Sequence, residues 1–193
     1  MCTLIETERL TLRPPELGDE VSLHRAINHS LTELQPWVVW ANNPRLTTSL
    51  QFVESAVKQW ASNKQSNFPM VIVHKEDGRI IGCAGFTEKS DPSVPLYEPG
   101  YWLDTRYTGR GLATEFTTAL TRYAFEKLNA KRVQLSIQAE NTKSINVAKR
   151  CGFELEATLH NACLDIQTGE AADTALFVCF DTKNLPTQKV SWT

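Results

Sequence analysis

The stretch RYTGRGLA at residues 106–113 decides the fold, because it places two glycines between a strand-like segment and an amphipathic helical pattern. Gly109 and Gly111 carry no Cβ atom, so the backbone there can lie close to a ligand. The N–H groups that open the following helix can receive an anion, and the helix dipole favours negative charge at that end. The pattern therefore predicts a phosphate-binding turn. A plain strand-to-helix connection is the competing interpretation.

Two nucleotide-binding motifs also use glycine-rich turns of this kind. The Walker sequence GxxxxGK[ST] is absent, and the dinucleotide fingerprint GxGxxG has Thr114 where its third glycine belongs. Glu140 could imitate the acid that binds a ribose. However, the dinucleotide fingerprint opens a parallel sheet, whereas here a hairpin and a further strand precede the loop. An NAD(P)-binding oxidoreductase is thus the weaker alternative.

The segments around this loop alternate between helical and strand periodicity. The pair Asp77-Gly78 predicts a hairpin turn. Pro99 interrupts a strand and predicts either a sheet edge or a bulge at residues 98–100. We predict one mixed α/β (α+β) domain over residues 1–193, with a largely antiparallel sheet flanked by helices. Its helices start near Asp19, Thr48, Gly111 and Asn141, and its strands cover residues 10–13, 68–74, 79–87, 96–103, 132–138, 153–160 and 174–180. Asp19 is expected to cap the first of these helices, Thr48 and Gln51 to form a capping box for the second, and Gly152 to give the last a left-handed C-terminal cap.

Composition excludes several classes of protein. The 193 residues carry 20 basic and 22 acidic side chains, a net charge of −2 that argues against a nucleic-acid partner. No apolar run approaches the roughly 20 residues that a membrane span needs, and no secretory signal is visible. Five scattered cysteines form no CxxC pair, which predicts reduced thiols, a cytoplasmic location and no metal site.

Three segments together resemble the GNAT superfamily of acetyl-CoA-dependent N-acetyltransferases. Residues 106–113 are similar to its [QR]-x-x-G-x-[GA] loop. Residues 100–115 (GYWLDTRYTGRGLATE) and 141–153 (NTKSINVAKRCGF) are similar to the RimJ/RimL branch, whose members acetylate the N-termini of ribosomal proteins. The opening ETERLTLRPPELGDE also resembles that branch, so the likeness extends over nearly the whole chain.

The resemblance implies acetyl-CoA as co-substrate, and a sheet whose central strands splay apart to admit the pantetheine arm. The N–H groups of residues 107–113 would hold the pyrophosphate, with Arg106 and Arg110 supplying positive charge. Asn141 would contact the pantetheine, with helix capping as its competing role. In full, the implied cofactor-binding residues are Trp102, Leu103, Arg106, Tyr107, Thr108, Gly109, Arg110, Gly111, Leu112, Ala113, Asn141 and Ser144.

The same resemblance implies direct attack of a neutral amine on the thioester. Glu98 would accept the proton of the amine, and Ser144 would protonate the departing thiolate. Family members commonly have EIGYWL where this chain has EPGYWL, so Pro99 removes an N–H beside the expected base. Trp37, Trp40 and Tyr101 are expected to wall the acceptor groove, with core packing as the alternative reading.

The sequence leaves several candidates for the amine that accepts the acetyl group. The leading hypothesis is a protein or peptide α-amine, and a small amine such as an aminoglycoside, a polyamine or an amino acid is the alternative. A non-catalytic acyl-CoA-binding sensor is a third reading, which an intact Ser144 and Glu98 disfavour. A homodimer could form through the closing hairpin or a sheet edge.

Overall fold

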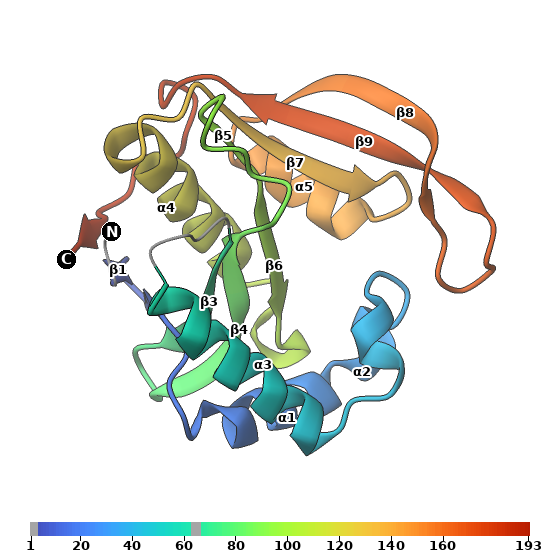
Figure 1. Ribbon diagram of the computed structural model, residues 1–193. Coiled ribbons are helices and arrows are strands. Elements are labelled where there is room, and N and C mark those ends of the chain that lie inside the picture. The colour runs from blue at the N-terminus through green and yellow to red at the C-terminus, as the bar shows by residue number, and fades with distance from the viewer. Residues whose placement is uncertain (1–3, 63–66) are drawn as a thin grey trace.

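The computed structural model describes residues 4–62 and 67–193, and it arranges them in two sheets with helices packed around them (Figure 1). The larger sheet is wholly antiparallel. Its strands lie in the order β10 (Ser191–Trp192), β1 (Ile5–Glu6), β2 (Leu10–Arg13), β3 (Phe68–His74), β4 (Arg79–Phe86) and β6 (Pro99–Leu103). As predicted, β3 and β4 form a hairpin around Gly78, which has a φ of 66°.

The smaller sheet lies in the order β5 (Leu96–Tyr97), β7 (Arg132–Gln138), β9 (Ala171–Cys179) and β8 (Glu154–Leu164). Its β7, β9 and β8 strands pair antiparallel, and the short β5 pairs parallel with β7. The β8–β9 hairpin is longer than predicted and extends away from the body of the molecule (Figure 1).

The segment predicted as one strand, residues 96–103, is divided between the two sheets. Leu96 and Tyr97 pair with β7, and from Pro99 onward the chain pairs with β4. The carbonyl of Glu98 accepts a hydrogen bond from Thr87 N, so Glu98 directs its backbone polar groups toward the larger sheet. Successive residues point to alternate sides, so Pro99 lacks the N–H that would face β7. Of the predicted edge and bulge, the structure has the edge: β6 is the last strand of the larger sheet, the chain changes sheets between Tyr97 and Pro99, and β6 and β7 splay apart.

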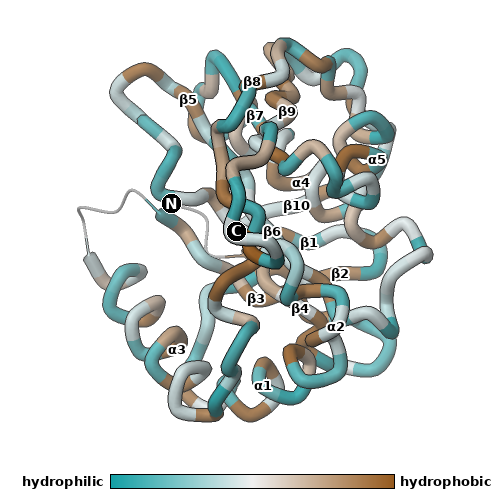
Figure 2. Tube along the Cα trace, turned by 90° about the vertical axis from the view of Figure 1, so that its right-hand side faces the viewer, coloured by the Kyte–Doolittle hydropathy of each residue, from teal (hydrophilic) through white to brown (hydrophobic). Residues whose placement is uncertain are grey.

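Helices cover both faces of the larger sheet. On one face, Leu23 of α1 (Asp19–His29) and Val53 of α3 (Leu46–Trp60) pack with Val71 and Ile80. On the other face, α4 (Leu112–Lys127) packs Phe116 and its neighbours into the main core. The shorter elements are α2 (Leu31–Leu34), η1 (Val39–Asn42), η2 (Thr105–Tyr107) and α5 (Thr142–Arg150). Figure 2 shows apolar residues concentrated along β3 and β4, where these layers meet.

Two helix starts differ from the sequence-based expectation. The capping box expected at Thr48 is wrong, because α3 already begins at Leu46, two residues after Pro44, and has no side-chain cap. Asp19 is the first residue of α1 and follows the N-cap residue Gly18. Its carboxylate instead binds Arg13 and the N–H of Glu16, so it fastens the preceding turn. In the described ranges, no helix is long and apolar enough to cross a membrane.

Gly152 ends α5 with a φ of 80°, and an added Cβ would lie 2.3 Å from the carbonyl oxygen of Asn184. Gly152→Ala is therefore expected to lower the free energy of unfolding by roughly 2–3 kcal/mol and Tm by roughly 5–10 °C. Gly169→Ala is the matched control, because Gly169 has a φ of 77° but open space around it. Thermal denaturation should show a clearly smaller shift for the control. Equal shifts would mean that the contact with Asn184 is unimportant.

Candidate functional site

The glycine turn joins β6 to α4, and a buried carboxylate at its start binds its backbone. Asp104 is fully buried, and its Oδ1 accepts a hydrogen bond from the N–H of Arg106 at 3.0 Å. Beyond this anchor the backbone adopts φ values of 75° at Gly109 and 79° at Gly111. Both values lie in the left-handed region that glycine adopts without strain. The two glycines are thus required by the path of the backbone.

The backbone donors of this turn divide into two groups. The N–H groups of Arg106, Tyr107 and Thr108 bind oxygens of Asp104 or Thr105. Those from Gly109 to Thr114 find no acceptor within residues 4–62 and 67–193, and the helical ladder starts at Glu115 N. The available cradle therefore begins and ends later than the predicted residues 107–113, because Tyr107 and Thr108 are already bonded within the loop. A run of unpaired N–H groups at a helix start is an anion-binding arrangement.

The two arginines of the motif have different environments. The Arg106 guanidinium binds both carboxylate oxygens of Asp104, and this hydrogen bonding raises the pKa of Arg106. Its charge is therefore largely used to support the loop. The guanidinium of Arg110 lies 5.3 Å from the centre of the Tyr107 ring on the exposed side of the turn. Arg110 is the arginine of this pair that is placed to meet an anion from solvent.

Tyr107 connects the turn to the β3–β4 hairpin. Its hydroxyl donates to Asp77 Oδ2 at 2.5 Å, and Nδ1 of His74 lies 3.1 Å from the other carboxylate oxygen. Burial and the neighbouring Asp77 raise the pKa of Tyr107, so the phenol stays protonated as the donor. The glycine turn is thus fixed on its N-terminal side, where Asp104 binds Arg106 and Asp77 binds Tyr107.

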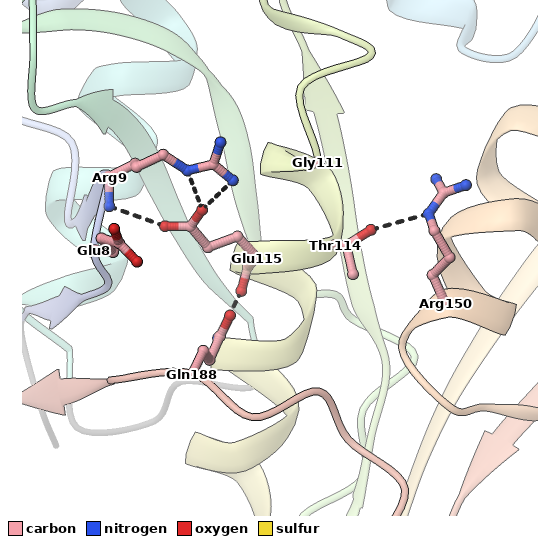
Figure 3. A pocket seen from close by; sticks show the side chains of 7 residues that line it. All are labelled: Glu8, Arg9, Gly111, Thr114, Glu115, Arg150 and Gln188. Atoms are coloured by element: carbon pink, nitrogen blue, oxygen red, sulfur yellow. Dashed lines mark hydrogen bonds and ion pairs between the residues drawn. The ribbon is translucent and has the colours of Figure 1, made fainter.

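A cavity of about 460 Å³ opens beside the start of α4 (Figure 3). Figure 3 shows Arg9 and Arg150 on opposite sides of that helix start. Arg9 binds Glu115 at 2.6 Å, and Arg150 donates to Thr114 Oγ1 at 3.3 Å. The lining residues are Glu8, Arg9, Gly111, Thr114, Glu115, Arg150 and Gln188.

Glu98 lies where the two sheets diverge. Its side chain is buried, and its Oε2 accepts hydrogen bonds from Gln134 at 2.8 Å and Ser136 at 3.1 Å, both on β7. The ammonium group of Lys89 lies 3.4 Å from Oε1. The carboxylate therefore bridges the gap between the sheets at its narrow end.

Asn141 and Ser144 lie at the start of α5. Asn141 is the N-cap, and its Oδ1 accepts from the backbone N–H of Ser144 at 3.1 Å. The capping role considered from the sequence is therefore present. It uses the backbone of Ser144 and leaves the serine hydroxyl available for other contacts.

Comparison with known proteins decides the family of this arrangement. Residues 9–154 match the model of the acetyltransferase (GNAT) domain, which is more than half of the chain. The chain belongs to the GNAT acetyltransferase family. It is an acetyl-CoA-dependent N-acetyltransferase, and the mixed fold and splayed strands predicted from the sequence are confirmed.

Relatives of this GNAT acetyltransferase align over most of its length. The uncharacterized N-acetyltransferase YnaD of Bacillus subtilis is 32% identical over 159 residues, covering 79% of this chain and 83% of that protein. The ribosomal-protein-serine acetyltransferase of Escherichia coli is 27% identical over 161 residues, covering 83% and 87%. The solved structure of Mycobacterium smegmatis RimJ in complex with CoA-disulfide superposes with a TM-score of 0.81 at 21% identity, covering 96% and 90%. This last likeness concerns the fold.

The three aromatic residues expected to form one wall in this acetyltransferase do not gather in one place. Trp40 is exposed and packs on Trp102, their ring centres 5.8 Å apart, on the face covered by α1 and α3. Tyr101 points to the opposite face and packs edge-on against Phe116 of α4 at 5.1 Å. Trp37 is half-buried in the turn after α2. Adjacent residues of a strand face opposite ways, which separates Tyr101 from Trp102.

The GNAT site fits acetyl-CoA on three observations. Unpaired N–H groups run from Gly109 to Thr114, and β6 and β7 leave their facing edges unpaired beyond Tyr97 and Val133. The phenolic oxygen of Tyr101 is buried and has no hydrogen-bond partner in the described structure. Each group lacks a partner that a bound pyrophosphate, pantetheine or thioester can supply.

Sequence reasoning missed Arg9 and Arg150 in this acetyltransferase. Arg9 precedes β2, about a hundred residues before the glycine turn, and Arg150 ends α5. Neither belongs to a phosphate-binding motif, and only the packing of β2 and α5 against α4 brings them to one cavity. The signal available in the sequence was the family resemblance, because ETERLTLRPPELGDE contains Arg9 and NTKSINVAKRCGF contains Arg150.

Proposed function

We propose that this acetyltransferase transfers the acetyl group to the α-amine of a protein or peptide N-terminus. The observation that carries the proposal is the alignment, over 83% of this chain, with a relative named for acetylating a ribosomal protein. The exposed Trp40 and the half-buried Trp102 support it, since they form an open apolar surface beside β6. Aromatic surfaces of this kind suit peptide side chains.

The residues at the split strands supply the chemistry of this proposal. Glu98 accepts the proton that the attacking amine loses, through an intervening water because the carboxylate is buried. A backbone N–H of the split strand stabilises the negative charge that develops on the thioester oxygen. Ser144 gives its hydroxyl proton to the departing thiolate sulfur and regains a proton from solvent. The proton lost by the amine balances the one gained by the thiol.

A panel of acceptors tests the substrate class. Thiol release from acetyl-CoA would be followed with a peptide bearing a free N-terminal serine, with the same peptide blocked at its α-amine and carrying an internal lysine, and with spermidine. We expect the free N-terminus to be acetylated fastest. Faster reaction with spermidine would instead make the protein a polyamine acetyltransferase, an activity named for a relative that is 24% identical.

The cavity of Figure 3 is proposed to hold the nucleotide end of acetyl-CoA, with Arg150 meeting its phosphate. Arg150→Gln is expected to raise KM for acetyl-CoA about 5- to 10-fold with little change in kcat, because one exposed charged hydrogen bond is lost. Added salt should weaken the wild type more than the variant.

Lys149→Gln is the matched control for this prediction. It removes the same charge from the same turn of α5, but Lys149 does not line the cavity. The KM for acetyl-CoA should stay near the wild-type value. If KM for acetyl-CoA rose equally in both variants, the cause would be the loss of positive charge from α5 in general. The nucleotide would then bind outside this cavity.

A further inference from the structure

The phenol of Tyr101 is a buried polar group that neither the packing nor the family motif accounts for. Its ring packs against Phe116, yet its oxygen is shielded from solvent and has no hydrogen-bond partner among the residues described. An unsatisfied buried hydroxyl costs about 1–3 kcal/mol, so a group of this kind needs an explanation. Tyr101 lies on β6, within the split where the thioester of the proposed function would react.

The polar side chain that approaches this phenol is Ser144. Its hydroxyl interacts with the phenol and lowers the pKa of Tyr101, and the phenolic oxygen has no other hydrogen-bond partner among the described residues. Burial is the larger influence and raises the pKa of Tyr101 to about 12. The phenol therefore stays protonated at neutral pH and is available only as a hydrogen-bond donor or a neutral acceptor.

We propose that Tyr101 is a positioning residue whose phenol donates a hydrogen bond to Ser144 Oγ during the reaction. The donated bond occupies a lone pair of the serine and turns its own proton toward the departing sulfur. It also stabilises the negative charge on Oγ as that proton leaves. No proton is transferred from Tyr101. The inference rests on the role of Ser144 in the proposed function.

This role requires a hydrogen bond that exists in the transition state and is absent from the resting enzyme. Ser144 is a far weaker acid than a thiol, so giving its proton to sulfur is uphill unless Oγ is stabilised. A neutral donor in a buried site provides that stabilisation without a charge to desolvate. Asn141 binds the backbone N–H of Ser144, so the cap leaves the serine hydroxyl free to accept the bond from Tyr101.

Tyr101→Phe tests the proposal, because it removes the hydroxyl and keeps the ring on Phe116. With acetyl-CoA and the fastest acceptor of the panel above, we expect kcat to fall about 5- to 10-fold and KM for acetyl-CoA to change less than about 2-fold. The Tm should be unchanged or higher, since an unsatisfied polar group has been removed. Tyr97→Phe is the matched control, because Tyr97 is also buried and packs edge-on against Phe86; its kcat should match the wild type.

The double variant decides whether Tyr101 acts through Ser144. In a Ser144→Ala background, Tyr101→Phe should change kcat less than about 2-fold. Equal losses in both backgrounds, or a raised KM with unchanged kcat, would overturn the inference. A wild-type rate for Tyr101→Phe alone would overturn it too, while leaving the function of Ser144 intact. A wild-type rate for Ser144→Ala would refute the proposed role of the serine, and the positioning role with it.

Discussion

Ser144→Ala is expected to lower kcat about 100-fold while KM for acetyl-CoA stays within about 2-fold, because the lost group acts only on the departing thiolate. This substitution should remove the hydroxyl without disturbing the start of α5. Asn141 caps α5 through the backbone N–H of Ser144, which alanine retains. The measurement is steady-state thiol release together with a thermal melt, and the Tm should not fall.

Thr142→Ala provides the control for Ser144→Ala. Thr142 is an exposed hydroxyl residue in the first turn of the same helix, and its loss should leave kcat unchanged. If Ser144→Ala matched this control in rate, the thiolate would be taking its proton directly from water. If it lowered Tm as well as kcat, the serine would be acting on the helix.

Glu98→Gln should cause a loss of similar size, about 100-fold or more in kcat, because glutamine cannot accept the proton of the amine. The amide has the shape of the carboxylate and can still accept from Ser136, so the gap between the sheets stays bridged. Lys89 loses an ionic partner, but its side chain is 62% exposed and solvent compensates for most of that loss. The protein should therefore fold normally and bind acetyl-CoA while reacting slowly.

Glu88→Gln serves as the comparison for Glu98→Gln, since Glu88 is an exposed carboxylate ten residues earlier that faces solvent. Only the Glu98 variant should lose activity. Raising the pH increases the fraction of neutral amine and should partly restore the rate of the Glu98 variant. A variant as fast as the wild type at neutral pH would show that the amine reaches the site already deprotonated.

The parts of the site predicted correctly from sequence are those whose cause is local. The left-handed φ at Gly152 follows from a glycine placed just after a helix, and the cap at Asn141 needs only the three residues after it. The split of residues 96–103 also has a local cause, the missing N–H of Pro99. Of the two readings of Pro99, the sheet edge is correct, and no bulge forms where β6 pairs with β4.

The parts that sequence reasoning missed are set by distant contacts. Asp77 reaches Tyr107 across 30 positions, and Arg9 reaches Glu115 across 106. Nothing in the sequence near either partner indicates the other. The ion pair of Arg106 with Asp104 was missed for another reason: the motif shows that an arginine is present, but not whether its side chain faces the ligand or a carboxylate of the protein.

The split between β6 and β7 gives the proposed co-substrate a second role. An unpaired strand edge presents free N–H and C=O groups that can pair with another chain, and folded proteins usually cover such edges. A pantetheine arm lying along β6 would complete the sheet much as an added strand does. In each catalytic cycle the sheet would then gain this piece with acetyl-CoA and lose it with the spent thiol. Turnover would be tied to the repeated completion and opening of the sheet, and departure of the product would be a structural step as well as a chemical one.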